Sequence, residues 1–312
     1  MNLSRPRILI IGVGRIGEAL AKIIAPTQQA EIALFDTDAS KISHGISLPQ
    51  LTLAADFIFL CIPSTAVRPT LQMCSSHLKP GAIVVCLVKG LDGESGATMY
   101  ELLQQMLPKQ VDLVILGGPM LSGELLQGKV AYGVAGTTPV IFSKLEELFR
   151  PTILRVAYCA DAQGVSVVGV LKNVYALGLG IAQALAVGDN ARGWLGTHAL
   201  QEMSTLITRL GGQPATTYSI AGLGDLLATG YSQHSRNRTA GEELVRTGHV
   251  SVPSEGLLTL PILIKRLGSY STFPFLETIV RVVIDHDDAR QAFDIFLQQG
   301  TTSGVAQESG AP

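Results

Sequence analysis

Charged side chains are scarce in this sequence of 312 residues: Asp, Glu, Lys and Arg make up 15% of it, against about 25% in an average globular protein. Because 47% of the residues are hydrophobic, the composition excludes a disordered chain and a charge-rich coiled coil. The 23 Lys and Arg do not outnumber the 25 Asp and Glu, so no basic surplus is available to neutralise a nucleic-acid backbone. We expect no nucleic-acid partner, and any anionic ligand must be bound by a local cluster.

Cysteine is also rare, and its four positions, Cys61, Cys74, Cys86 and Cys159, form no Cys-x-x-Cys pair. Three of them lie in or beside apolar runs, where a thiol behaves as a small hydrophobic group. We expect a reducing, cytoplasmic environment with no disulfides and no metal site. The apolar start of the chain imitates a signal peptide, but Arg15 follows at once and a small-residue cleavage site is missing, which favours a buried first strand.

The segment from Gly164 to Gly188 runs for 25 residues with Lys172 as its single charge, and a bilayer-spanning helix needs about 20 apolar residues. A lysine inside the membrane would cost about 2.5 to 3.5 kcal/mol on insertion scales, and the polar Asn173 follows it. We therefore predict no membrane span and a helix buried at the centre of a large domain.

Two domains are expected from the length. Up to about residue 160, short β-rich runs alternate with helical stretches, which is typical of parallel βαβ units. Their continuous hydrophobicity fits strands covered on both faces by helices. The expected strands are Arg7 to Ile11, Glu31 to Phe35, Asp56 to Ile62, Ala82 to Val88, Asp112 to Leu116 and Val130 to Ala135.

Beyond these runs, residues 164 to 298 read as helices joined by Gly-rich or Pro-marked turns. The predicted fold class is α/β, with an N-terminal doubly wound, mostly parallel sheet in residues 1–163. A mainly α-helical domain would follow in residues 164–300. Residues 301–312 contain nothing that could pack and are expected to be a loose tail.

Gly12, Gly14 and Gly17 form a G-x-G-x-x-G motif between the first expected strand and a helix. The first glycine permits a tight turn, the second lets backbone approach a pyrophosphate, and the third allows close helix packing. Asp36 follows nineteen residues after Gly17, at the end of the next strand, where a carboxylate would bind the adenosine ribose. This context predicts a Rossmann-type dinucleotide site rather than a purely structural turn, and the negative charge favours NAD over NADP.

Two further pairs, Pro63 with Ser64 and Lys89 with Gly90, follow expected strands. Ligands of open parallel sheets bind at such carboxyl ends. Pro63 could simply end a strand and Lys89 could be a solvated loop lysine, but we favour a functional Lys89.

Lys172 and Asn173 lie within the most apolar stretch of the chain. A lysine there is costly unless it is paired or lines a polar cavity, and such surroundings lower the pKa of active-site lysines. Gly169, Ala176 and Gly180 recur at helical spacing and would leave space near the polar pair. A structural lysine whose ammonium extends to the surface is the alternative.

The segment from Ala221 to Thr239 holds two more polar features. Asp225 precedes an apolar helix start and could serve only as an N-cap. Arg236, Asn237 and Arg238 form the densest polar cluster, and arginine suits bidentate binding of phosphate, although such a cluster is usually a solvated loop.

Four segments resemble the NAD(P)-dependent glycerol-3-phosphate dehydrogenase family of the bacterial soluble type, and the resemblance extends from Arg7 to about Ile284. The segments are GVLKNVYALGLGIAQALAVGDNARG, LGGQPATTYSIAGLGDLLATGYSQHSRNRTAG, VKGLDGESGATMYELL and GGPMLSGELLQG. The resemblance implies that Lys172 is the central catalytic group, with Lys89 and Asp225 beside it. It also implies the binding residues. The substrate would be bound by Asn173, Thr229, Arg236 and Asn237, and the last two of these would bind its phosphate. The cofactor would contact Gly12, Gly14, Arg15, Ile16, Gly17, Asp36, Pro63, Lys89, Arg236 and Glu255.

The sequence also departs from the family pattern. Ile16 stands where an aromatic residue is usual, and many members have a basic residue near Asp36. Only nineteen residues separate Asp36 from Asp56, where the family has a longer helix and strand. We expect one strand to be missing, or reduced to a few residues around Ile46 to Leu48.

The resemblance implies an enzyme that interconverts dihydroxyacetone phosphate and sn-glycerol 3-phosphate with NAD, in the direction that feeds glycerophospholipid synthesis. Two alternatives stay open. A 3-hydroxyacid dehydrogenase shares the two-domain plan, but it places its asparagine one helical turn after the lysine, at Ala176. A non-catalytic NAD-binding sensor or scaffold would have little reason to keep costly buried charges. A homodimer is expected from the high apolar content.

Overall fold

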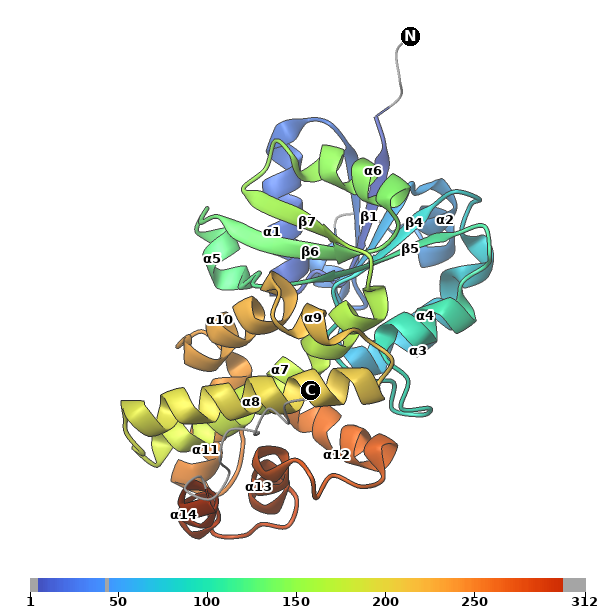
Figure 1. The fold of residues 1–312 in the computed structure, drawn as a ribbon. Coiled ribbons are helices and arrows are strands. Elements are labelled where there is room, and N and C mark those ends of the chain that lie inside the picture. The colour runs from blue at the N-terminus through green and yellow to red at the C-terminus, as the bar shows by residue number, and fades with distance from the viewer. Residues whose placement is uncertain (1–4, 43–44, 300–312) are drawn as a thin grey trace, which may run out of the picture.

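A computed structural model describes residues 5–42 and 45–299 and contains a seven-stranded sheet followed by a helical domain (Figure 1). The strand order is β2-β1-β3-β4-β5-β6-β7, and all neighbours are parallel except β5 and β6. This confirms the predicted fold class. The strands are β1 (Arg7–Ile11), β2 (Glu31–Phe35), β3 (Phe57–Leu60), β4 (Ile83–Cys86), β5 (Asp112–Gly117), β6 (Ala131–Gly136) and β7 (Leu154–Cys159).

All six expected strands are present, and the seventh, β7, was not expected. It lies at the edge of the sheet beside β6, and only its first residue, Leu154, is fully buried. The prediction relied on continuous hydrophobic runs, whereas a half-covered edge strand has no such run.

Two layers of helices sandwich the sheet. Successive residues of β3 point to opposite sides, so that Phe59 packs in one hydrophobic cluster and Ile58 in the other. The Phe59 cluster is covered by α1 (Arg15–Ile24), α5 (Ser122–Leu126) and α6 (Pro139–Phe149). The Ile58 cluster is covered by α2 (Leu48–Ala54), α3 (Ser64–Cys74) and α4 (Met99–Met106), and it continues into the core of the helical domain.

The connection between β2 and β3 is short. It holds a 3₁₀ turn (Ala39–Lys41) and α2, and its described residues contain no strand. Of the two expected alternatives, a strand missing from this segment agrees with the described residues, whereas a strand reduced to Ile46 to Leu48 is wrong, because Leu48 begins a helix. Ser47 and Gln50 form a capping box at its start and Pro49 occupies its first turn, which are strong signals for a helix N-terminus.

The second domain is built around α7 (Ala162–Ala184). This helix is long and apolar enough to span a membrane, but its apolar stretch lies wholly inside the protein, as the sequence predicted. Asp161 caps it by accepting a hydrogen bond from the Gly164 amide. Around it lie α8 (Asp189–Arg209), α9 (Pro214–Thr217), a π-helical turn (Ile220–Gly224), α10 (Asp225–Tyr231), α11 (Arg236–Thr247), α12 (Glu255–Leu267), α13 (Pro274–Val283) and α14 (Ala289–Gln299). The expected tail, residues 301–312, lies outside the described residues.

Small residues on α7 serve two different purposes. A Cβ at Gly169 would lie 3.3 Å from Cγ of Lys89, so this glycine does leave room for a polar side chain. A Cβ at Gly180 would instead collide with the backbone carbonyl of Arg238. Gly180 therefore permits the close crossing of α7 and α11, which corrects the expectation that it leaves space beside Lys172.

Candidate active site

The glycine-rich turn lies where the strand order reverses, between β1 and β3. Gly12 has a φ of +94°, and a Cβ there would lie 2.7 Å from the carbonyl oxygen of Cys61. A Cβ at Gly17 would collide with the Gly12 carbonyl, whereas the Cβ position of Gly14 has no atom within 4 Å. Gly14 is also the N-cap of α1. Gly12 and Gly17 thus make the turn tight, and Gly14 leaves an open approach to a helix N-terminus, which fits a dinucleotide pyrophosphate.

Asp36 is fixed beside this turn. Its Oδ2 accepts a hydrogen bond of 2.7 Å from the Val13 amide, and its Oδ1 accepts one of 2.9 Å from Asp38. The Lys41 ammonium lies 3.7 Å from Oδ2. The carboxylate at the end of β2 is therefore held next to the glycine turn, in the position that binds an adenosine ribose in Rossmann folds.

The remaining predicted cofactor residues border the turn. Arg15 is exposed and begins α1, followed by the half-buried Ile16. The Arg15 guanidinium extends toward α5, where a Cβ at Gly123 would lie 3.1 Å from its Nη2. Pro63 is exposed and is the N-cap of α3, directly after β3.

Two lysines from different domains meet at one carboxylate. Nζ of Lys89, in the loop after β4, lies 2.5 Å from Oδ2 of Asp225, and Nζ of Lys172 lies 3.2 Å from its Oδ1. Lys172 also donates a 2.8 Å hydrogen bond to Oγ1 of Thr229, one turn after Asp225 on α10. As whole residues, Lys172, Asp225 and Thr229 are at most 6% exposed. Asp225 is thus far more than a helix cap, because it pairs with both ammonium groups.

Burial dominates the electrostatics of this cluster. It lowers the pKa of Lys172 to about 8, with the negative charge of Asp225 opposing the shift and the positive charge of Lys89 adding to it. Burial alone would raise the pKa of Asp225, but the charges of Lys172 and Lys89 outweigh it and hold that pKa below its ordinary value. The site therefore keeps an ionised carboxylate and an ammonium whose proton is weakly held near neutral pH.

A chain of amides continues from this cluster. Asn173 donates from Nδ2 to the Lys89 carbonyl at 2.9 Å and accepts at Oδ1 from Nδ2 of Asn237 at 2.7 Å. Asn237 in turn accepts at Oδ1 from the Gly256 amide at 2.8 Å. Both asparagines are buried, so α7, α11, α12 and the loop after β4 are held in fixed relation.

Glu255 and Arg236 occupy two helix starts nearby. Glu255 is the first residue of α12, and its Oε2 accepts a 2.9 Å hydrogen bond from Oγ of Ser64 at the start of α3. Arg236 is the first residue of α11 and is exposed. Its guanidinium makes no hydrogen bond or ion pair with any residue that the structure describes. This leaves its donors available to a ligand.

One residue at the site was not singled out from the sequence. The carbonyl oxygen of Gly118, after β5, accepts a 2.9 Å hydrogen bond from Nζ of Lys89. Gly118 has a φ of +99°, and the Gly-Gly-Pro sequence after the fifth strand was the signal that could have indicated it.

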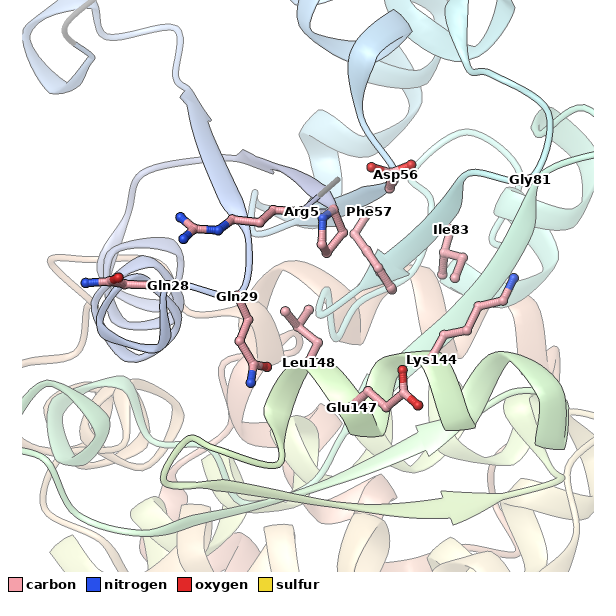
Figure 2. A pocket seen from close by; sticks show the side chains of 11 residues that line it. Arg5, Gln28, Gln29, Asp56, Phe57, Gly81, Ile83, Lys144, Glu147 and Leu148 are labelled. Atoms are coloured by element: carbon pink, nitrogen blue, oxygen red, sulfur yellow. The ribbon is translucent and has the colours of Figure 1, made fainter. Parts of the chain in front are cut away.

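The structure also contains a cavity of about 580 Å³ elsewhere. Figure 2 shows Lys144, Glu147 and Leu148 of α6 opposite Phe57 and Ile83. Since these last two begin β3 and β4, the cavity is at the amino ends of the strands. The predicted site residues that follow strands, such as Pro63 after β3 and Lys89 after β4, lie at the opposite, carboxyl ends of the strands. The cavity is therefore separate from the candidate site.

The sheet domain carries a glycine turn suited to a dinucleotide, and its Lys89 is joined through Asp225 to the buried Lys172 ammonium of the helical domain. This is the arrangement of a two-domain NAD(P)-dependent dehydrogenase. Comparison with family models is more specific. Residues 161–294 match the model described as NAD-dependent glycerol-3-phosphate dehydrogenase C-terminus, and residues 40–140 match its N-terminus counterpart. The chain belongs to this family of oxidoreductases, as the sequence resemblance predicted.

Individual relatives support the assignment. The chain is 36% identical over 263 residues to a glycerol-3-phosphate dehydrogenase [NAD(P)+] of Thermus thermophilus, covering 77% of this chain and 80% of the relative. A second such protein, from Sphingopyxis alaskensis, is 32% identical over 263 residues, with 77% and 78% covered. The crystal structure of glycerol-3-phosphate dehydrogenase from Coxiella burnetii shares the fold, with a TM-score of 0.83 over 96% of this chain and 99% of that one, at 24% identity.

Proposed function

We propose that this chain catalyses the reversible, NADH-dependent reduction of dihydroxyacetone phosphate to sn-glycerol 3-phosphate. The observation that carries the proposal is the buried Lys172 ammonium, which contacts Thr229 and Asp225 and shares that carboxylate with Lys89 of the cofactor domain. Family membership supports the same activity, since the curated relatives are named for it.

Lys172 is the proposed general acid. A bound NADH supplies a hydride to the carbonyl carbon of the substrate. As negative charge develops on the carbonyl oxygen, the Lys172 ammonium neutralises it and transfers a proton, and its pKa of about 8 suits this transfer near neutral pH. A positioned general acid of this kind contributes about 10² to 10⁴ in rate, and a preorganised positive charge in a buried site adds electrostatic stabilisation.

Asp225 and Lys89 complete the proposed catalytic group. Asp225 places a negative charge beside both ammonium groups, and for Lys172 this charge opposes the lowering of the pKa by burial. Lys89 is the less buried of the two lysines, with 19% of its side chain exposed against 7% for Lys172. Its ammonium is therefore the more accessible of the two and would also contact the substrate and the cofactor.

Substrate binding is assigned to four residues. Thr229 and Asn173 would orient the hydroxyl and carbonyl groups, since both side chains already lie beside Lys172 or Lys89. Arg236 and Asn237 would bind the phosphate, because they open α11, whose N-terminal amides and dipole favour an anion. The guanidinium of Arg236, which is exposed and pairs with no described residue, adds a charge-assisted donor pair.

The cofactor is assigned to the glycine turn and its surroundings. Gly12, Gly14 and Gly17 would hold the pyrophosphate with Arg15 and Ile16 beside them, and Asp36 would bind the ribose and disfavour the 2′-phosphate of NADP. Pro63, Lys89, Arg236 and Glu255 would lie around the nicotinamide end. The open space at Gly14 and the fixed Asp36 carboxylate support this assignment.

A substrate panel with a matched variant tests the proposal. The purified protein should oxidise NADH with dihydroxyacetone phosphate and reduce NAD with sn-glycerol 3-phosphate, and Lys172→Ala should lower kcat by about 10² to 10⁴ while still binding NADH. Turnover of hydroxyisobutyrate-type acids with none of glycerol 3-phosphate would favour the 3-hydroxyacid dehydrogenase alternative. NADH binding without any turnover would favour the sensor.

The setting of the enzyme is also part of the proposal. We infer a cytoplasmic homodimer that works toward glycerol phosphate for lipid synthesis, and four unpaired cysteines are compatible with a reducing compartment. We place the domain boundary at the start of α7, two residues before the predicted division between residues 163 and 164, because β7 ends at Cys159 and α7 begins at Ala162.

A further inference from the structure

Helix α12 contacts the sheet domain at both of its ends. At its start, Glu255 accepts the hydrogen bond from Ser64, and a Cβ at Gly90 would lie 2.8 Å from Oε2 of Glu255. The backbone directly after Lys89 therefore packs against the first residue of this helix. The second contact is in the last turn of α12, about 11 residues further on.

Arg266 makes that second contact with three hydrogen bonds. Its Nη1 donates to the Gly96 carbonyl at 2.7 Å and to Oε2 of Glu101 at 2.6 Å, and its Nη2 donates to Oε1 of Glu101 at 2.8 Å. The two side chains are 22% and 31% exposed. Bidentate pairing of this kind fixes orientation as well as distance.

The carboxylate that Arg266 binds is itself anchored. Oε2 of Glu101 accepts a 2.7 Å hydrogen bond from the Thr98 amide in the capping box of α4, and Oε1 accepts one of 3.3 Å from Nε2 of Gln163 at the start of α7. Arg266 is thus paired with a carboxylate that hydrogen bonds from the starts of α4 and α7 already hold in place.

The loop between the two contacts begins at Lys89 and is internally braced. The Asp92 amide donates a 2.8 Å hydrogen bond to the Ala97 carbonyl, and Leu91 forms an antiparallel β-bridge with Thr98. Because the loop is closed in this way, we expect a shift at Gly96 to reach its other end, where the Lys89 side chain contacts Asp225 in the helical domain.

We propose that Arg266 is a positioning residue for the reaction, whose pairing with Gly96 and Glu101 holds the loop after β4 so that the Lys89 ammonium stays on Asp225. The inference rests on the proposed function of Lys89 and Lys172. Arg266 does not touch the reacting atoms and acts only through the placement of Lys89. We call the contacts of Arg266 with Gly96 and Glu101 the Arg266 clamp.

Kinetics of Arg266→Ala test the proposal. If the clamp places Lys89, kcat should fall by about tenfold to a hundredfold, the range that follows from small misplacements of a catalytic group. The high-pH limb of the rate profile should also move to higher pH. The positive charge of Lys89 lowers the pKa of Lys172, and this effect weakens as Lys89 moves away. Arg266→Lys should recover part of kcat, since one ammonium can replace some of the three hydrogen bonds.

Arg281→Ala is the matched control. Arg281 pairs through Nε with Asp287 at 2.7 Å in the helical domain, and its loss should leave kcat and the pH profile at wild-type values. If Arg266→Ala lowers the unfolding temperature but leaves kcat and the pH limb unchanged, the positioning role is wrong and Arg266 is only structural. Should that variant not fold, Glu101→Gln is the substitute, because glutamine preserves the capping box and removes the charge that pairs with Arg266.

Hydrogen exchange of the protein without cofactor gives a readout independent of activity. Amides of residues 89–98 should exchange faster in Arg266→Ala than in the wild type or in Arg281→Ala, and unchanged exchange would overturn the clamp. If the wild type does not reduce dihydroxyacetone phosphate, the proposed function fails, while this exchange comparison still tests the clamp itself.

Discussion

The Lys172 ammonium lies 3.2 Å from Oδ1 of Asp225, and the two side chains are 7% and 2% exposed. Neither charge has bulk water to solvate it, so each depends on the other. The same carboxylate is 2.5 Å from Lys89. Two cations therefore share one anion, and the charge of Asp225 opposes the lowering of the Lys172 pKa by burial.

Asp225→Asn tests this dependence. Removing the negative charge takes away the effect that opposes burial, so the pKa of Lys172 should fall below about 8. The high-pH limb of the rate profile for ketone reduction should then move to lower pH, and kcat at pH 7 should fall because less Lys172 is protonated. A steady-state pH series is the measurement, and a limb that stays in place would contradict the role of Asp225.

Stability should change with the same substitution. Removing one partner of a buried ion pair costs about 3 to 5 kcal/mol, and part of this is recovered where Lys172 becomes neutral. The loss should therefore be larger at low pH, where Lys172 is forced to stay charged, than at pH 9. Urea unfolding of Asp225→Asn and the wild type at the two pH values measures the difference, and Asp287→Asn at an exposed pair is the control.

The general plan of the site could be predicted from sequence because it depends on local features. A buried lysine in an apolar helix is conspicuous, and glycines between a strand and a helix define their own geometry. Gly118 was not singled out, since a backbone carbonyl that accepts from Lys89 leaves no side-chain pattern, and the pairing of the Ser64 hydroxyl with Glu255 was not expected although Ser64 itself was named. Both contacts exist only after segments distant in sequence pack together.

The same reasoning explains the errors in the fold. Continuous hydrophobic runs identify strands buried on both faces, so the method found β3 and β4 but overlooked the half-exposed edge strand β7. A missing strand between β2 and β3 was one of two expected alternatives, and the other, a remnant strand at Leu48, was wrong because Ser47 and Gln50 are a local helix signal. Arg266 was not singled out because its importance depends on a loop about 170 residues earlier.

Asp36→Asn tests the predicted preference for NAD. Asparagine can keep the hydrogen bond from the Val13 amide through its Oδ1, so the glycine turn should remain in place. The negative charge that would repel a 2′-phosphate is lost, and Lys41, which lies 3.7 Å from Asp36 and 3.9 Å from Asp38, loses one of its two carboxylate partners and can attract the phosphate. The ratio of kcat/KM for NADH to that for NADPH should fall by about tenfold, equivalent to about 1.4 kcal/mol.

Lys41→Ala separates the two contributions. In the wild-type background it should change the ratio little, because Asp36 still repels the phosphate. In the Asp36→Asn background it should cancel part of the gain with NADPH. An unchanged ratio in Asp36→Asn would show that the carboxylate does not face the ribose position.

Gly12→Ala and Gly14→Ala form a pair that distinguishes folding from cofactor binding. Gly12 adopts a left-handed φ of +94° and abuts the Cys61 carbonyl, so alanine there should lower the free energy of unfolding by at least about 1 to 3 kcal/mol. Gly14 has a φ of −80° and an open Cβ position, so alanine should leave stability nearly unchanged. Its methyl group would instead stand where backbone must approach the pyrophosphate, and NADH affinity should fall.

Urea unfolding and fluorescence titration with NADH, on both variants, measure the two effects. Wild-type NADH affinity in Gly14→Ala would place the cofactor elsewhere, because a methyl group at the centre of the assigned pyrophosphate site cannot be accommodated without cost.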